Sequence, residues 1–87
     1  MADVHLPPTL PPLFPGLPRQ VDLDAATVDE AIEVLNNRWP GLRDRLCEPG
    51  PVLRPHINVF VDSERAALDS AIDARSRVDV IAAISGG

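Results

Sequence analysis

Residues 77–87 have the sequence RVDVIAAISGG, and this stretch decides the fold that we predict. Two sets of side chains alternate along it: Val78, Val80, Ala82 and Ile84 against Asp79, Ile81, Ala83 and Ser85. A period of two predicts a β-strand. Because the run is almost continuously apolar, we expect a strand from Val78 to Ile84 that is covered on much of both faces.

Two glycines follow the predicted strand. Gly86 and Gly87 have no Cβ, so we expect residues 85–87 to form a thin, flexible tail beyond a folded domain of residues 1–84. A terminal carboxylate on such a tail can enter a narrow pocket of another protein. We therefore predict that the carboxylate of Gly87 is the reactive group.

The composition limits the possible functions. Eighty-seven residues form one domain with a small core. The single cysteine, Cys47, excludes an internal disulfide and indicates a reducing cytoplasm. No apolar run is long enough to span a membrane, and no secretory signal is recognisable. A net charge of −5 argues against nucleic acid and favours a partner with a basic surface.

The N-terminal part predicts a hairpin with an unusual loop. Val4–Leu6 and Val21–Leu23 have the strand alternation, and six of the twelve residues 7–18 are proline. We expect a stiff, polyproline-like connector that bends at Gly16. Four apolar side chains are expected to pack it on the domain: Leu10, Leu13, Phe14 and Leu17. Alternatively, its two PxxP patterns, residues 8–11 and 12–15, are a ligand for a proline-reading adaptor domain.

The middle of the chain contains the clearest helix signal. Thr27 and Glu30 form a capping box, and Pro40-Gly41 ends the helix near Arg38. The apolar residues at helical spacing are Val28, Ala31, Ile32, Leu35 and Trp39. A further helical turn is expected over Leu42–Leu46, followed by a turn at residues 48–51.

The C-terminal half predicts the remaining strands. Ile57–Val61 alternates, Arg65–Leu68 is a candidate return strand, and the loop 69–77 is expected to be pinned by Ala71 and Ile72. We expect the final strand to lie beside the first. A hairpin, a crossing helix and a central parallel strand predict an α+β, ubiquitin-like β-grasp fold. Its mixed sheet has four to five strands packed on one main helix.

The side chains offer no catalytic constellation. His5 and His56 are far apart, Cys47 belongs to no pair, and no metal-ligand spacing or nucleophile elbow is present. We interpret Cys47 as a packed residue and His56 as a surface residue. The sequence therefore predicts a protein that binds no metal or cofactor of its own and is not an enzyme acting alone.

Two segments resemble one protein family. Residues 54–64, RPHINVFVDSE, resemble the hxNVFVNGE strand and turn of the MoaD/ThiS family of ubiquitin-like sulfur carriers, and residues 78–87 resemble its VxIhPAVAGG-like final strand and tail. This family includes the small subunit of molybdopterin synthase and the sulfur carrier of cysteine biosynthesis. Ala82 stands where the family often has proline, and Ser63 where its turn often has glycine. The family's DGD-like turn is missing from residues 73–77.

The resemblance implies a mechanism. A ubiquitin-activating-type enzyme would use ATP to adenylate Gly87, and a sulfurtransferase or sulfide would supply sulfur to give a thiocarboxylate. A sulfur-accepting synthase in cysteine, secondary-metabolite or cofactor biosynthesis would then receive the sulfur. Ser85, Gly86 and Gly87 would enter the partner's active site, and Phe60 and Ile81 are candidate docking residues. The free protein would be a monomer.

Two other functions stay open at this point. The chain could be a molybdopterin synthase small subunit, whose tail inserts into a large catalytic subunit. It could also be a protein modifier conjugated to lysines. All eight of its basic residues are arginines, so it could not build lysine-linked chains on itself.

Overall fold

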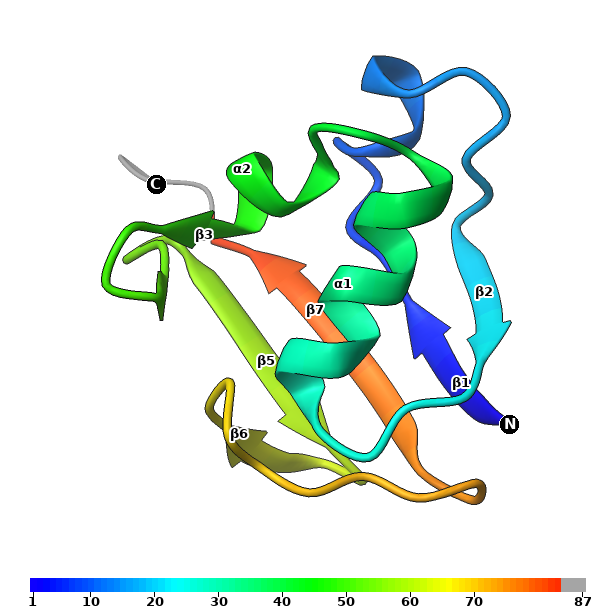
Figure 1. Cartoon of the computed structure of the whole chain (residues 1–87), viewed down its shortest axis with the longest axis vertical. Coiled ribbons are helices and arrows are strands. Elements are labelled where there is room, and N and C mark those ends of the chain that lie inside the picture. The colour runs from blue at the N-terminus through cyan, green and yellow to red at the C-terminus, as the bar shows by residue number, and fades with distance from the viewer. Residues whose placement is uncertain (84–87) are drawn as a thin grey trace.

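A computed structural model describes residues 1–83 and contains a five-stranded sheet in the order β2-β1-β7-β5-β6 (Figure 1). The strands are β1 (Ala2–His5), β2 (Gln20–Leu23), β5 (Ile57–Val61), β6 (Glu64–Ala66) and β7 (Arg77–Ala82). β1 and β7 are parallel, whereas the other neighbours are antiparallel. With helix α1 (Val28–Arg38) on one face, the arrangement confirms the predicted β-grasp fold and the adjacency of the first and last strands.

Helix α1 forms where the capping signal predicts it. The Thr27 hydroxyl oxygen accepts a hydrogen bond from the Glu30 backbone N–H at 3.1 Å, which satisfies one of the free donors of the first turn. Four apolar side chains of the helix are buried against the sheet: Val28, Ala31, Ile32 and Leu35. Trp39 packs partly buried against the same core, and α2 (Leu42–Leu46) follows with both of its leucines buried.

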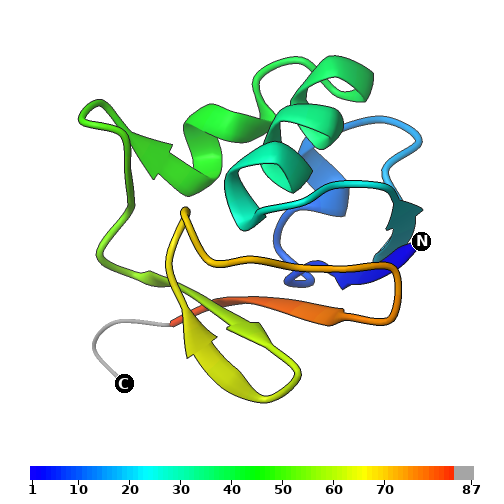
Figure 2. The same cartoon turned by 60° about the horizontal axis from the view of Figure 1, so that its bottom comes forward.

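Strand β7 is covered on one face only, so the prediction of two covered faces is wrong. Val78 and Val80 are almost completely buried under α1, whereas the Ile81 side chain is 47% exposed. Figure 2 shows the reason, since the helices lie on one side of the sheet. The strand begins at Arg77 and ends at Ala82, and Ile84 lies outside the described residues.

The proline-rich segment is not a continuous polyproline helix. A short 3-10 helix, η1 (Pro11–Leu13), interrupts it, and Gly16 makes the predicted bend with a φ of +83°. Leu10 and Leu17 are buried as predicted, but Leu13 is 49% exposed. Because an adaptor of the SH3 type needs a regular polyproline helix, this geometry does not favour the PxxP interpretation.

Two local predictions also differ from the structure. The return strand β6 covers Glu64–Ala66 and so begins and ends earlier than the predicted Arg65–Leu68. The Ala71 side chain, which was expected to pin the loop, is exposed, and the contact that Ala71 makes is a backbone β-bridge to Thr27. The turn predicted at residues 48–51 is present, and it is flanked by a two-stranded hairpin of β3 (Cys47–Glu48) and β4 (Val52–Leu53), which was not predicted. Within residues 1–83, no helix is both long and apolar enough to cross a lipid bilayer.

The β5–β6 turn provides a test of this backbone. Asp62 and Ser63 have φ values of +49° and +72°, as in the type I′ turns that favour glycine. The left-handed region is unfavourable for residues with a Cβ, so Ser63→Gly should raise the free energy of unfolding by about 0.5–1 kcal/mol in urea denaturation. Ser63→Ala keeps the Cβ and should bring no gain. An alanine variant as stable as the glycine variant would contradict the turn geometry.

Candidate functional site

The first feature of the site is the end of β7. This strand pairs with β1 on one side and with β5 on the other, and its last pairing joins Ala82 to Ile57. The Ala83 N–H donates to the His56 carbonyl at 2.7 Å, so the chain is held to the sheet centre up to that residue. The predicted tail residues Ser85, Gly86 and Gly87 lie outside the described residues, and their role stays a prediction.

The second feature is the uncovered face of the sheet. Phe60 and Ile81 both point to it, because their neighbours Val59 and Val80 are buried on the helix side. In register, Phe60 lies opposite Asp79 and Ile81 opposite Asn58, so the two candidate docking residues are diagonal neighbours. The structure therefore brings them to one surface, whereas their docking role remains a proposal.

Polar groups on the uncovered face are paired with each other. Nε2 of His5 lies 2.9 Å from the Asp3 carboxylate, and Gln20 donates to the same carboxylate. Arg77 Nε lies 3.2 Å from Asp79. The hydrogen bond from His5, followed by the one from Gln20, lowers the pKa of Asp3 below its ordinary value. These contacts hold the polar side chains beside Ile81 and Phe60 in place.

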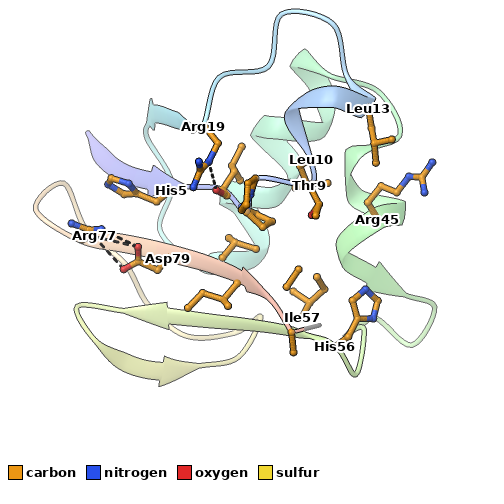
Figure 3. A pocket seen from close by; sticks show the side chains of 17 residues that line it. His5, Thr9, Leu10, Leu13, Arg19, Arg45, His56, Ile57, Arg77 and Asp79 are labelled. Carbon is orange, nitrogen blue, oxygen red and sulfur yellow. Dashed lines mark hydrogen bonds and ion pairs between the residues drawn. The ribbon is translucent and has the colours of Figure 1, made fainter. Parts of the chain in front are cut away.

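The third feature is a groove that sequence reasoning missed. It has a volume of about 560 Å³ and lies between the start of the proline-rich segment and the end of β7 (Figure 3). Its walls are mainly apolar, from Leu6 to Leu10 on one side and from Val80 to Ala83 on the other. Figure 3 shows Arg45 and His56 at one end. These two residues are distant in sequence, so no motif could have indicated the groove.

Cys47 and His56 are placed as the sequence predicts. Cys47 is 6% exposed, and burial raises the pKa of its thiol, which the nearby Arg43 offsets only in part. This environment disfavours the reactive thiolate. His56 is exposed in the turn before β5, as predicted for a surface histidine. Within residues 1–83, no three acidic, histidine or cysteine side chains are grouped so that they could hold a metal ion.

A mixed sheet with one main helix on one face and, within residues 1–83, nothing on the other defines a ubiquitin-like β-grasp protein. Comparison with known proteins agrees with this fold. No protein-family model matches the chain. Small archaeal modifier protein 1 of Haloferax volcanii is 36% identical over 69 residues, which cover 78% of this chain and 79% of that protein.

Solved structures add the fold comparison. A chain of the BexX/CysO complex of Amycolatopsis orientalis superposes with a TM-score of 0.86 at 26% identity, over 100% of both chains. CysO of Mycobacterium tuberculosis, described as an antigen, gives 0.85 at 25% identity over 97% of this chain and 100% of CysO. The chain belongs to the MoaD/ThiS-type family of ubiquitin-like sulfur carriers, which confirms the resemblance found in the sequence. Membership supports a general carrier or modifier role.

The hydrogen bonds around Asp3 predict a measurable titration change. His5→Ala removes the largest cause of the lowered pKa, so the pKa of Asp3 should rise toward its ordinary value in a carboxyl NMR titration. A lowered folded-state pKa stabilises the protein above the unfolded-state value, and this stabilisation is lost as pH falls through the folded value. The variant should therefore lose less stability on acidification. His56→Ala, in an exposed turn, is the control and should leave Asp3 unchanged.

Proposed function

We propose that this protein is a sulfur carrier whose reactive group is the carboxylate of Gly87. The observation that carries the proposal is the position of β7. The strand is held between β1 and β5 from Arg77 to Asp79 and by β5 alone as far as Ala83, so the last fixed residue stands two positions before Ser85 in the chain. The similarity to CysO of Mycobacterium tuberculosis and to a chain of the BexX/CysO complex of Amycolatopsis orientalis supports the same function.

The proposed chemistry has two steps before sulfur is delivered. A carboxylate oxygen of Gly87 attacks the α-phosphorus of ATP, which gives an acyl-adenylate and releases pyrophosphate. Sulfide, or a persulfide of a sulfurtransferase together with a reducing thiol, then attacks the acyl carbon and displaces AMP, leaving a thiocarboxylate. Transfer of that sulfur to an acceptor, followed by hydrolysis of the acyl carbon, regenerates the carboxylate.

The partner enzymes supply the catalytic groups in this proposal. A ubiquitin-activating-type enzyme binds ATP, and a biosynthetic synthase accepts the sulfur. The carrier contributes docking and alignment, which turn a dilute carboxylate into a positioned one. Side chains on Gly86 or Gly87 would hinder both the passage of the tail and the attack on the carbonyl. We place these reactions in the cytoplasm, where reduced sulfur donors and thiols persist.

Intact mass spectrometry tests the chemistry directly. The protein is incubated with an activating enzyme of the ubiquitin-activating type, ATP and sulfide. Its mass should rise by the difference between one sulfur and one oxygen atom. A variant with alanine in place of Gly86 and Gly87 should gain no sulfur, although its fold should be unchanged because the described sheet and core are built from residues 2–82.

Two results would count against the sulfur-carrier proposal. One is an unchanged mass of the native chain under conditions in which CysO, as the positive control, is converted. The other is conversion of the double-alanine variant at the native rate. The first result would contradict activation of the Gly87 carboxylate, and the second would remove the requirement for the two glycines, because an alanine at position 87 still ends in a carboxylate.

We assign the docking of the activating enzyme to the apolar part of the uncovered sheet face. Ile81 is 47% exposed and Phe60 lies diagonally beside it, close to the point where the tail begins. Exposed apolar side chains in a cluster are typical anchors of protein–protein contacts.

Ile81→Asp should reduce kcat/KM for thiocarboxylate formation by about tenfold, because a charge would replace a buried apolar contact. Val52→Asp is the matched control, since Val52 is also exposed, at 49%, but lies in the β3–β4 hairpin. The control should react at the native rate. Equal losses in both variants would remove the docking assignment.

A role as a protein modifier is the second candidate, and the 36% identity to small archaeal modifier protein 1 favours it. Adenylation of Gly87 would be shared, but a lysine amine of another protein would displace AMP and form an amide. The same mass experiment distinguishes the two functions when a lysine-containing target is added, because conjugation gives a product with the summed mass of the two proteins less one water.

A further inference from the structure

We propose that the groove beside β7 binds an extended, acidic segment of a partner protein, which adds to the sheet as a further strand. The inference concerns a recognition site and does not depend on the chemistry proposed for Gly87. It rests on an unpaired strand edge, on the apolar walls beside that edge and on the charges that surround it.

Strand β7 is longer than its neighbour on one side. β1 pairs with it only from Arg77 to Asp79, whereas β5 pairs with it as far as Ala82. Among the described residues, the β1 side of Val80, Ile81 and Ala82 therefore has no strand partner. Instead, this edge lines the groove. A strand edge with free backbone groups is a template for another extended chain.

The backbone direction supports this interpretation. The Arg77 carbonyl accepts from Asp62 and the Ala83 N–H donates to His56, so odd-numbered residues of β7 direct their polar groups to the β5 side. Because successive residues alternate, Val80 and Ala82 direct theirs to the other side. The Val80 carbonyl and both backbone groups of Ala82 therefore point to the groove.

Pro7 explains why the edge is left open. If the β1–β7 register continued, Pro7 would lie opposite Ile81 and its nitrogen would face the Val80 carbonyl. Proline has no N–H to donate, so the ladder stops there. The chain forms a turn there instead, in which the Leu10 N–H donates to the Pro7 carbonyl at 3.1 Å. The following residues form the opposite wall and leave space between the two.

The charged side chains around the groove indicate which kind of segment would bind there. Its lining contains three arginines, Arg19, Arg45 and Arg77, together with His5 and His56, and one carboxylate, Asp79. This surface is basic although the whole chain has a net charge of −5. Asp79 is paired with Arg77, whereas no carboxylate of residues 1–83 lies within ion-pair distance of Arg19 or Arg45. An acidic segment complements such a surface.

The walls define the rest of the recognition pattern. An added strand would direct alternate side chains to the uncovered face, beside Ile81, and to the apolar floor near Leu10. We therefore expect a segment in which small apolar and acidic residues alternate. Its binding would place the partner directly beside Ala83, two residues before the predicted tail.

An NMR titration tests the proposal with a defined probe. The probe is a blocked octapeptide of alternating valine and glutamate, and its control is the same peptide with arginine in place of glutamate. The acidic peptide should shift the amide signals of Val80, Ile81 and Ala82 and slow the exchange of the Ala82 amide by about tenfold or more. The basic peptide should not bind.

Matched variants separate strand addition from general charge attraction. Ala82→Pro removes the donor at the open edge but no hydrogen bond to β5, and it should weaken binding by about tenfold or more. Arg45→Glu should weaken it by about tenfold, because reversal replaces an attraction by a repulsion. Arg75→Glu makes the same charge change in the exposed loop before β7 and should bind like the native chain.

Several results would overturn the proposal. They are absence of binding, equal binding of the basic peptide, signal shifts confined to the Phe60 surface, and native affinity of the Ala82→Pro variant. Protected amides on the β5 side of β7 will show that this variant is folded. If it is not folded, native affinity of both Arg45→Glu and Arg19→Glu is sufficient to reject the site. Dimerisation of the protein through this edge would equally exclude a partner segment as the occupant.

Discussion

The pairing of β7 with β1 and β5 is the constraint on which the rest of the structure depends. The first and last strands of the chain meet in parallel at the centre of the sheet, which a tight turn cannot achieve. The chain must therefore cross over the sheet, and α1 makes this crossing while it buries the apolar face. Val4, Val59 and Val78, each 1% exposed, come from three neighbouring strands and form the floor of that core.

This constraint also determines where the chain can act. A terminal segment that follows a central strand begins at a rigid position, whereas one that follows an edge strand would move with the fraying edge. The Ala83–His56 hydrogen bond is the last fixed point described before the glycines. The domain can thus dock through one surface and present its proposed reactive group at a reproducible distance from it. Such positioning is the contribution that a carrier without catalytic side chains can make.

Local signals in the sequence predicted the elements that depend on local interactions. The capping box at Thr27 and the alternation over Ile57–Val61 gave the helix and β5 almost to the residue, because a side-chain hydrogen bond and a period of two are local properties. The exposure of Ile81 could not be derived this way. An apolar residue in an apolar run does not reveal that only one helix is available to cover the sheet.

The same limit applies to the candidate site. Phe60 and Ile81 could be proposed from the sequence as apolar residues of two predicted strands, whereas their diagonal placement follows from the β5–β7 pairing, which only the structure shows. The groove depends on Arg19, Arg45 and His56, which three different parts of the chain bring together. The β3–β4 hairpin was missed because strands of two residues are too short to show a period.

The proline-rich segment connects the stability of this fold with its recognition surface. An unpaired edge in a small β protein favours aggregation, and natural proteins limit it by shortening or covering it. Here the open edge extends over three residues, Val80 to Ala82, and the segment that begins at Pro7 lies across the groove from it. Prolines suit this position because they lie beside the edge but have no N–H with which to hydrogen-bond to it. A segment with free N–H groups could continue the ladder along this edge, so the prolines help to keep the groove open beside the end of β7.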